Sequence, residues 1–487
     1  MNGCGVIYNS PFRFFEGVFQ KLPLLNERHT MTSLNPDQLK AANAFLDFML
    51  SDDIYAVITG PAGVGKTFLM EHLSNNGMKM YADACTLIQE EPKYTETHFT
   101  ATTNKAAEVL GTSIGKPVST IHSFLGLKIQ RNFDTGKAFL TKSRNFHIRE
   151  GVVVFIDEAS TIDTDLMKFL DIGLPNCKIV FVGDHAQMAP VNEDISPAFL
   201  IGKPENCYTL TTPVRNADTP ALMALCQQLR DTVETGIFKP IVAVPGVIEY
   251  LTPDHMEEGL GYVFEDPDPS CRVLCFTNDR VKDYNAHIRE DVRSLPAHLT
   301  VGEAVVVGDS YQRGQLTFSV EQQLTITSVG PDLPTGYEYE GEPVMARDVG
   351  FGDADPDAPF FGAPVCTNPH VLKSALAVVK RRKDWRTFYE MKDRFLDIRD
   401  KASCTVYKSQ GSSYDFVFVD LGNIGTSFDA QQVARMIYVA VSRARHKVFF
   451  YGELPNRYND SKGAQLWIPK NGPNSSQENS SNTTEAA

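Results

Sequence analysis

Residues 60 to 67 read Gly-Pro-Ala-Gly-Val-Gly-Lys-Thr, and this short stretch decides the fold. It follows the apolar run Ala56 to Ile58, which predicts a buried strand, and precedes Phe68 to Leu73, which predicts a helix. A glycine-rich turn between a strand and a helix presents successive backbone N–H groups to an anion at the positive end of the helix. The stretch therefore predicts a phosphate loop.

The positions of this loop have separate tasks in binding a nucleoside triphosphate. Lys66 reaches the β- and γ-phosphate oxygens, and the Thr67 hydroxyl holds Mg²⁺. The other nucleotide-binding positions are Gly60, Pro61, Ala62, Gly63, Val64 and Gly65. We expect ATP and Mg²⁺ as the cofactors of an ATP hydrolase.

Length and composition are those of a soluble protein with several domains. The chain has 487 residues, enough for about three domains. No apolar run approaches the roughly 20 residues of a membrane helix, so no membrane segment is expected. The cysteines form no C-x-x-C pair and no secretory signal is visible, which favours a reducing cytoplasm. Cys271 and Cys275 are closest, and buried thiols on a strand suit them better than a zinc site.

The net charge of −14 is a real objection to a nucleic-acid partner, because backbone binding depends on Lys and Arg neutralising phosphates. The objection is limited. A narrow channel can hold a single strand with local cations, hydroxyls and stacking rings while the outer surface stays acidic.

Short apolar runs that end in polar residues alternate with helical patterns along the chain. The runs are His98 to Ala101, Val152 to Ile156, Lys178 to Val182, Val273 to Phe276, Phe416 to Val419 and Lys447 to Phe450. Such strands predict an α/β fold with parallel sheets covered on both faces and with chemistry at the carboxyl ends of the strands. Because the runs fall into two groups, we expect two α/β units.

Other segments have a different character. Residues 36 to 50 predict an amphipathic helix, and residues 291 to 401, rich in Gly, Pro and Asp, predict a smaller, mostly β insertion. Residues 1 to 33 read as an accessory extension or the product of an upstream start codon. The tail from Asn471 is polar and has no core formers, so we expect it to be disordered.

Two polar groups follow the strands after the phosphate loop. Asp157 and Glu158 end the first of these strands: Asp157 is the expected Mg²⁺ ligand, and Glu158 is the expected base that activates the attacking water. Gln187 follows the next strand and is a candidate sensor of the γ-phosphate. The alternative for Asp157 and Glu158 is an acidic pair on the solvated surface.

The order of these motifs resembles that of superfamily 1 helicases, and their spacing is closest to the phage Dda and RecD-like group of the B class. The resemblance covers about residues 34 to 455. It implies two RecA-like domains, with Gln38 reading the adenine edge, Arg215 on the γ-phosphate, Gly411 beside the nucleotide and Arg443 as a finger from the second domain. Such fingers contribute about 10³ to 10⁵ in rate. The alternative for Arg443 is a solvated surface cation.

The same resemblance implies the residues that contact the strand. In motif Ia and the motif after it these are Thr103, Asn104, Lys105 and His122, and in motif V they are Thr405, Tyr407 and Lys408. Here the sequence departs from the family, which usually has Pro-Thr-His where this chain has Thr102 to Asn104, and often a histidine at the position of Tyr407. His122 is alternatively a structural histidine.

Residues 127 to 142 alternate in character around Asp134 to Gly136, which predicts a β-hairpin. The family places a strand-splitting pin at this position, with Phe139 as its aromatic residue; the alternative is that Phe139 packs on its own domain. Trp385 and Tyr389 lie at helical spacing and resemble an aromatic helix beside the strand, with core packing as the alternative.

The expected domains are an extension at 1–33, a first RecA-like domain at 34–203 with the pin at about 124–148, a second at 204–290 plus 402–455, the insertion at 291–401, and a tail at 456–487. The expected function is an ATP-dependent helicase that moves 5′ to 3′ on single-stranded DNA and acts on forks, in replication or recombination.

We also expect a monomer in the cytoplasm of a phage-infected bacterium, with a single-strand-binding protein or replisome proteins as partners. The rival functions are a nucleic-acid-stimulated ATPase that strips proteins from DNA, and a small-molecule kinase that uses the same phosphate loop.

Overall fold

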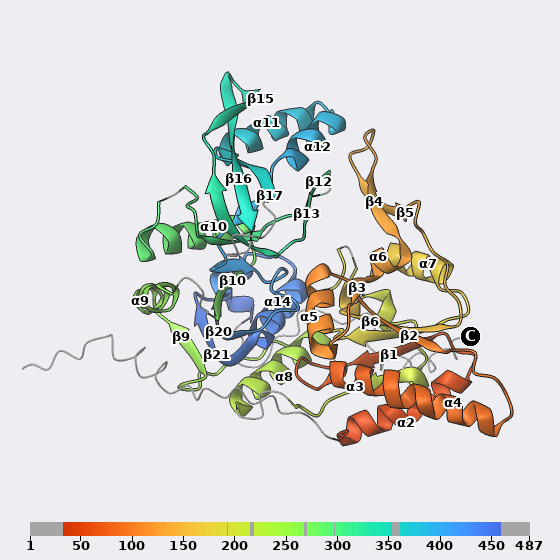
Figure 1. Cartoon of the computed structure of the whole chain (residues 1–487). Helices are drawn as coiled ribbons and strands as arrows, with labels where there is room; N and C mark the ends of the chain where they lie inside the picture. Colours follow the sequence, from red (N-terminus) through yellow and green to blue (C-terminus); the bar gives the residue numbers. More distant parts are fainter. Residues whose placement is uncertain are drawn as a thin grey trace, which may run out of the picture.

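Two parallel β-sheets, each flanked by helices, form the lower part of the molecule, and a mostly β insertion rises above the second sheet (Figure 1). The computed structural model describes residues 33–191, 193–214, 219–266, 270–296, 298–314, 316–352 and 361–458. The expected accessory extension and polar tail lie almost wholly outside these ranges.

The first sheet has the strand order β3-β2-β6-β7-β1-β8, with all neighbours parallel. Its elements are α2 (Pro36–Leu50), β1 (Tyr55–Thr59), α3 (Lys66–His72), α4 (Met78–Leu87), β2 (Glu96–Ala101), α5 (Asn104–Ile114), β3 (Ser119–Thr120), α6 (Ile121–Leu125), β6 (Val152–Asp157), α7 (Thr164–Gly173), β7 (Lys178–Gly183) and β8 (Cys207–Thr209). The predicted strands and the helix at 36–50 are confirmed.

The first residue of β7 shows how a charge is tolerated inside this sheet. Lys178 is fully buried, and its Nζ donates to the carbonyls of Phe48 and Ser51 at 2.8 Å each. These carbonyls lie at the end of α2, where helical carbonyls have no partner in the helix itself. The buried lysine therefore fixes the end of α2 against the sheet.

The second sheet has the order β19-β10-β20-β21-β9, again all parallel. Its elements are α8 (Pro220–Thr235), β9 (Ile248–Leu251), α9 (Pro253–Phe264), β10 (Cys271–Cys275), α10 (Asn278–His287), β19 (Ser403–Thr405), β20 (Tyr414–Asp420), α13 (Leu421–Ile424), α14 (Ala430–Ser442) and β21 (Ala444–Tyr451). The strands are nearly continuous apolar runs because helices cover both faces.

The domain boundary expected at residue 204 is too early. Strand β8 pairs with β1, through Val57 and Cys207 among others, and so completes the first sheet. Helix α8, which follows, packs against α14 in the core of the second unit. The chain therefore crosses between the units after Thr209 and before α8.

The insertion consists of a six-stranded antiparallel sheet, a separate two-stranded sheet of β12 and β13, and two helices; it is the barrel-like element expected between residues 291 and 401. Its elements are β11 (Ala304–Val307), β12 (Tyr311–Arg313), β13 (Leu316–Phe318), β14 (Gln323–Val329), β15 (Leu333–Tyr339), β16 (Glu342–Gly352), β17 (Phe361–Cys366), α11 (Pro369–Arg381), α12 (Trp385–Arg394) and β18 (Ile398–Arg399). Helix α12 lies on the side that faces the first unit (Figure 1).

The predicted hairpin is present as β4 (Leu127–Arg131) and β5 (Ala138–Lys142), which pair antiparallel. It projects from the first unit toward the insertion (Figure 1). Gly136, at the turn, has a φ of 70°, a left-handed conformation that favours glycine.

Candidate functional site

The phosphate loop connects β1 to α3 at the carboxyl edge of the first sheet. A Cβ added to Gly60 would lie 2.3 Å from the carbonyl oxygen of Leu210, so no larger residue fits there. Gly63 and Gly65 have φ values of 84° and 81°, which other residues rarely adopt. Three glycines are thus required by the loop's own geometry, as the phosphate-loop prediction implies.

Lys66 is the first residue of α3, and its ammonium is folded back onto the loop. Its Nζ donates to the carbonyl oxygens of Gly60 at 2.7 Å and Pro61 at 2.9 Å. Desolvation lowers the pKa of Lys66, and the charges of Asp184, Asp157 and Glu158 oppose this shift. Phosphate oxygens would exchange for the two carbonyls without moving the lysine out of the loop.

The acidic pair lies where β6 ends, close to Lys66. Desolvation, followed by the neighbouring charge of Glu158, raises the pKa of Asp157 to about 7. A carboxylate that is costly to ionise is relieved by a bound cation, and oxygen donors are the ligands that Mg²⁺ prefers. The Asp157 carboxylate and the Thr67 hydroxyl therefore suit the expected Mg²⁺.

Glu158 has a left-handed backbone, with a φ of 53° that is unusual for a residue other than glycine. Its carbonyl accepts a hydrogen bond from Thr102 Oγ1 at 3.1 Å and one from Thr161 Oγ1 at 3.2 Å. Because Thr102 begins the expected motif Ia, the catalytic pair and this strand-side motif are joined by direct bonds.

Two neighbouring residues in the first turn of α2 support the loop. Gln38 is fully buried; its Oε1 accepts from the N–H of Asn35, and its Nε2 donates to the carbonyls of Val64 and Gly65 at 3.2 and 3.3 Å. Both polar ends of Gln38 thus have partners within the protein. The reading of an adenine edge by Gln38 stays a prediction.

Asp37 was missed by the sequence reasoning. Its carboxylate accepts four hydrogen bonds, from the N–H and hydroxyl groups of Thr211 and Thr212, at 2.8 to 2.9 Å. These bonds, the Thr211 N–H first, lower the pKa of Asp37 to about 2. They anchor the segment that leads to Arg215, which itself lies outside the described residues.

A buried network around Asp184, after β7, joins the first sheet to the second unit. Asp184 has no exposed surface; it accepts a hydrogen bond from the Tyr438 hydroxyl of α14 and pairs with Arg230 of α8 at 3.4 Å. Arg230 also pairs with Glu234 at 3.1 Å. Burial opposes ionisation of Asp184, yet Arg230 and Lys66 lower its pKa. The carboxylate is thus held ionised at the interface.

Arg435 of α14 crosses the interface between the units. It is almost fully buried, and its guanidinium donates to the backbone carbonyls of His185, Gln187 and Asp194 in the first unit, at 2.6 Å for His185 and 2.8 Å for Asp194. The apolar side chains of Ala186 and Met188 pack in the core of the second unit beside these bonds. The loop that carries Gln187 is thus fixed by residues of the second unit.

Gln187 is 4% exposed, and its Oε1 accepts a hydrogen bond from the Gln410 amide at 3.1 Å. Gln410 belongs to the expected motif V, after β19. The same amide nitrogen lies 3.2 Å from Glu158 Oε2. Motif V therefore reaches both the residue expected to activate the attacking water, Glu158, and the candidate sensor of the γ-phosphate, Gln187.

Arg443, the expected finger, is held at the end of α14. It is 4% exposed and donates to the carbonyls of Val439 at 3.2 Å and Ser412 at 3.3 Å. Ser412 follows Gly411, so Arg443 lies beside the end of motif V. Contact between Arg443 and a γ-phosphate stays a prediction, as does the place of Gly411 beside the nucleotide.

On the strand side, the residues of motif Ia form the start of α5. Thr103 is exposed and caps the helix by accepting from the N–H of Ala106 at 3.1 Å. Asn104 is exposed, and Lys105 pairs with Glu108 at 3.1 Å. These groups are available to a phosphate at a helix N-terminus, and strand contact by them stays a prediction.

His122 lies in α6 and is half-buried, and burial lowers its pKa. The neutral imidazole that results can donate or accept a hydrogen bond but carries no charge for a phosphate. Both interpretations of His122, strand contact and structural histidine, remain open.

The strand-side residues of motif V are partly engaged with other elements. Thr405 is 6% exposed, and its hydroxyl accepts from the N–H of Lys408 at 3.3 Å. Lys408 Nζ donates to the carbonyl of Gly308 in the insertion. Tyr407 is 39% exposed, with its hydroxyl accepting from Gln432 at 2.7 Å. Tyr407 therefore has the most accessible side chain of the three.

The aromatic residues of α12 pack against the hairpin. The ring of Trp385 lies so close to Gly136 that a Cβ there would be 2.3 Å from it, and the Tyr389 hydroxyl donates to the Gly136 carbonyl at 2.8 Å. Arg131 of β4 lies over the Tyr389 ring at 4.2 Å. Phe139, in contrast, is 44% exposed. Its expected role as the pin residue, and the strand contacts of Trp385 and Tyr389, stay predictions.

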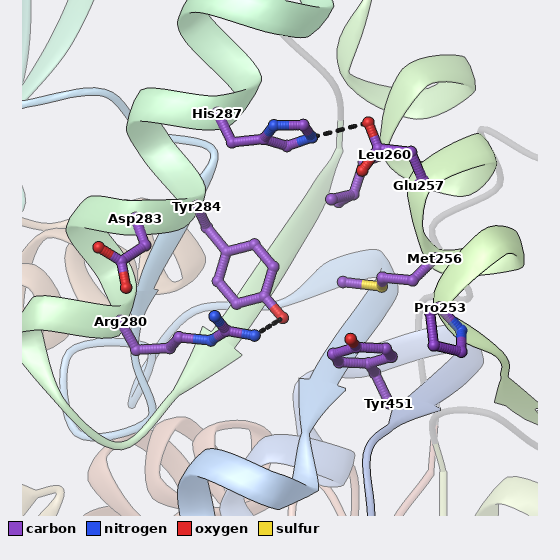
Figure 2. A pocket seen from close by; sticks show the side chains of 9 residues that line it. All are labelled: Pro253, Met256, Glu257, Leu260, Arg280, Asp283, Tyr284, His287 and Tyr451. Atoms are coloured by element: carbon purple, nitrogen blue, oxygen red, sulfur yellow. Dashed lines mark hydrogen bonds and ion pairs between the residues drawn. The ribbon is translucent and has the colours of Figure 1, made fainter.

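A separate cavity of about 230 Å³ opens between α9 and α10, beside Tyr451 at the end of β21 (Figure 2). Arg280 points into it but is already paired with Asp420 at 2.8 Å, and His287 is paired with Glu257 at 2.9 Å. Glu257 and Asp283 make the lining unfavourable for a phosphate. The cavity is therefore not a second nucleotide site.

The fold and these contacts define the class of the chain: a phosphate-loop NTPase built from two parallel-sheet units whose nucleotide site borders their interface. A family model described as an AAA domain matches residues 33–239, and one described as a UvrD-like helicase C-terminal domain matches residues 402–451. Together with the full-length similarity reported next, these matches support the resemblance of the chain to superfamily 1 DNA helicases of the B class.

The ATP-dependent DNA helicase dda of Enterobacteria phage T4 is 24% identical over 473 residues, which cover 86% of this chain and 100% of that protein. The RecBCD enzyme subunit RecD of Buchnera aphidicola is 28% identical over 174 residues, 32% of this chain and 26% of that subunit. A solved structure of Pif1 helicases at forked double-stranded DNA aligns with a TM-score of 0.46, 14% identity and coverage of 88% of this chain and 94% of that one. The Pif1 helicase of Candida albicans aligns with a TM-score of 0.43, 17% identity and coverage of 88% and 96%.

Within the described residues, no helix is both long and apolar enough to cross a bilayer.

Sequence reasoning missed Arg230, Gln410 and Arg435, although each joins the two units. Gln410 follows Lys408 of the expected motif V, and Arg435 lies about two helical turns before Arg443, so the expected site residues marked the neighbourhood of both. Arg230 follows no motif.

Proposed function

We propose that the chain hydrolyses ATP to move along single-stranded DNA and to separate the duplex ahead of it, in the 5′ to 3′ direction. One observation carries the proposal most directly. The amide of Gln410 bonds to Glu158 and Gln187, and Gln410 follows Tyr407 and Lys408 in the same turn. The hydrolytic residues and the expected strand contacts are therefore connected through a single loop.

ATP binding has a defined effect on the groups around the phosphate loop. The β- and γ-phosphates would replace the carbonyls of Gly60 and Pro61 as partners of Lys66, and backbone N–H groups of the loop would bind the remaining oxygens. Arg443 would turn from the Ser412 carbonyl toward the γ-phosphate. The second change would draw the two units together, because Arg443 belongs to the second unit and the phosphate loop to the first.

Hydrolysis needs a base and an oriented water. Glu158 would orient the water and accept its proton, Gln187 would sense the γ-phosphate, and Mg²⁺ held by Asp157 and Thr67 would neutralise charge on the phosphates. Loss of the γ-phosphate removes the partner that Arg443 gained, so the units separate again. If the grip on the strand alternates between motif Ia and motif V, each cycle moves the protein by about one nucleotide.

The hairpin provides a surface for strand separation. Phe139 is exposed on β5, and a base stacked on it would gain about 1 to 3 kcal/mol, comparable with about 1.4 kcal/mol for a stacking step in duplex DNA. Because α12 packs on the turn of the hairpin, the hairpin is braced against the insertion. A braced wedge transmits force to the fork better than a free loop.

Unwinding of matched forks tests the proposal. Forks with a 5′ single-stranded tail should be unwound when ATP is present, and forks with a 3′ tail should not. Unwinding of the 3′-tailed forks alone would refute the direction. Removal of bound proteins without separation of either fork would favour a remodelling ATPase, and an ATPase rate unchanged by saturating single-stranded DNA would favour the small-molecule kinase.

We further propose that a RecA-like unit lies on each side of the interface, the first from residue 34 to about 209 and the second at about 219–290 plus 402–455. The protein would be a monomer. It would act in replication or recombination, in the cytoplasm of a phage-infected bacterium. The phage relative supports this setting. A single-strand-binding protein is the partner that the substrate favours.

A further inference from the structure

Gln410 occupies a particular point between the two units. It belongs to the loop that follows β19 in the second unit, and its amide nitrogen lies 3.2 Å from Glu158 Oε2, 3.1 Å from Gln187 Oε1 and 3.0 Å from Ser160 Oγ, all in the first unit. An amide group has two hydrogens for these three acceptors. Its donor capacity is therefore fully used by Glu158, Ser160 and Gln187.

This nitrogen lies where a water bound to both Glu158 and Gln187 would lie. A water that Glu158 orients and deprotonates must be within hydrogen-bond distance of Glu158, and it must lie near Gln187 if Gln187 senses the γ-phosphate that the water attacks. The Gln410 nitrogen already contacts both groups. The amide and the water therefore compete for the same place.

The strand-side end of the same loop can move Gln410. Tyr407 and Lys408 precede it, and Ser409 between them is fully buried, with its hydroxyl donating to the Val406 carbonyl at 2.7 Å and its N–H donating to the Thr405 carbonyl at 3.1 Å. These bonds make residues 405 to 410 a tight turn. A shift of Tyr407 and Lys408 on a strand is therefore passed to Gln410 and not absorbed between them.

We propose that Gln410 is a positioning residue that fills the site of the attacking water until a single strand engages Tyr407 and Lys408. The inference rests on the proposed function and deepens it, because it states how strand binding stimulates hydrolysis. Without a strand, Gln410 keeps the water from Glu158; with a strand, the turn withdraws and the water enters.

The test compares ATP hydrolysis by Gln410→Ala with and without a saturating oligothymidylate. The substitution removes the competing amide, so the rate without the strand should rise about fivefold, the equivalent of one net hydrogen bond. The rate with the strand and the KM for ATP should change by less than about twofold, so the stimulation ratio should fall about fivefold. A strand-free rate that falls or stays the same overturns the inference, since Gln410 is then needed for catalysis or irrelevant to it.

Two further variants keep the test decisive. Gln410→Met retains the length of the side chain without its donors and should also raise the strand-free rate; it decides the matter if Gln410→Ala does not fold. Gln227→Ala removes an exposed glutamine of α8 and should leave both rates unchanged. If single-stranded DNA does not stimulate ATP hydrolysis by the wild-type protein, the proposed function is refuted. The rate of hydrolysis by the variants without a strand tests the role of Gln410 separately.

Discussion

The nucleotide side and the strand side of this molecule are built in opposite ways. At the interface behind the phosphate loop, Asp184, Arg230 and Arg435 are buried, and each bonds across the interface to a group of the other unit. On the strand side, Asn104 and Phe139 are exposed. Hydrolysis requires groups fixed before the reaction, whereas a strand that must be gripped and released needs accessible groups with weaker local support.

The comparison predicts that the largest losses come from the nucleotide side, and Lys66→Ala should give the largest. Without the ammonium, charge developing on the transferred phosphoryl group lacks its partner, and kcat should fall about 10³-fold. Steady-state ATP hydrolysis measures this loss. The matched control is Lys79→Ala, an exposed lysine of α4 that should retain full activity. Near-normal hydrolysis by Lys66→Ala would place the chemistry elsewhere.

Arg435→Ala should be next in size. The change leaves the carbonyls of His185 and Asp194 without their donor, and each such bond to a charged group contributes about 1.5 to 3 kcal/mol. The strand-stimulated kcat should fall at least about tenfold, and the melting temperature should drop. Arg445→Ala, which removes a half-exposed arginine paired with Asp415, is the control. If both variants behave alike, the interface does not depend on Arg435.

The affinity for Mg²⁺ with nucleotide should depend on pH through Asp157. The pKa of this carboxyl is raised to about 7, so below that pH it holds a proton that the metal must displace. Affinity should therefore fall about tenfold per pH unit below pH 7 and level off above it. Isothermal titration calorimetry from pH 5.5 to 8.5 measures how the affinity for Mg²⁺ with nucleotide changes with pH. The Asp157→Asn variant lacks the titrating carboxyl and therefore shows how much of this change comes from protonation of the nucleotide itself. An equal slope in both proteins would refute the assignment.

Smaller effects are expected on the strand side. Phe139→Ala should slow fork unwinding about fivefold, the loss of one base stack, while ATP hydrolysis on single strands stays within about twofold. Ile129→Ala on the partner strand of the hairpin, 72% exposed, is the matched control and should unwind normally. Equal loss of unwinding and hydrolysis with Phe139→Ala would indicate a folding defect instead of a wedge.

The Trp385→Ala variant distinguishes two roles of Trp385: support of the hairpin, and direct contact with the DNA strand. If Trp385 supports the hairpin through Gly136, unwinding should slow by a few-fold with no change in affinity for single-stranded DNA. If it stacks on a base, that affinity should fall by about 1 to 3 kcal/mol. Fluorescence anisotropy with a labelled oligothymidylate, beside the fork assay, distinguishes the two.

Local sequence patterns were enough to predict those candidate site residues that lie in the turn directly after a buried strand. The phosphate loop, Asp157, Glu158 and Gln187 all follow buried strands, and parallel strands bring their carboxyl ends to one edge. The hairpin could be predicted in the same way, because its turn residues and the alternating character of its strands are local features of the sequence. The fold class therefore followed from short windows of sequence.

Groups whose roles depend on distant partners could not be predicted in this way. Arg230 and Arg435 look like ordinary helix residues until α8 and α14 meet the loop after β7. The spacing of Trp385 and Tyr389 predicted their helix, but not that a hairpin some 250 positions earlier would pack on it. The boundary expected at residue 204 failed for the same reason, since the partner of β8 is β1.

A crystal structure with Mg²⁺, a non-hydrolysable ATP analogue and an oligothymidylate tests the central claim most directly: the nucleotide binds at the interface and draws the units together. The account predicts that Lys66 leaves the carbonyls of Gly60 and Pro61 for the phosphates, and that Arg443 leaves Ser412 for the terminal phosphate. An Arg443 guanidinium that stays on Ser412 while the nucleotide is bound would contradict it.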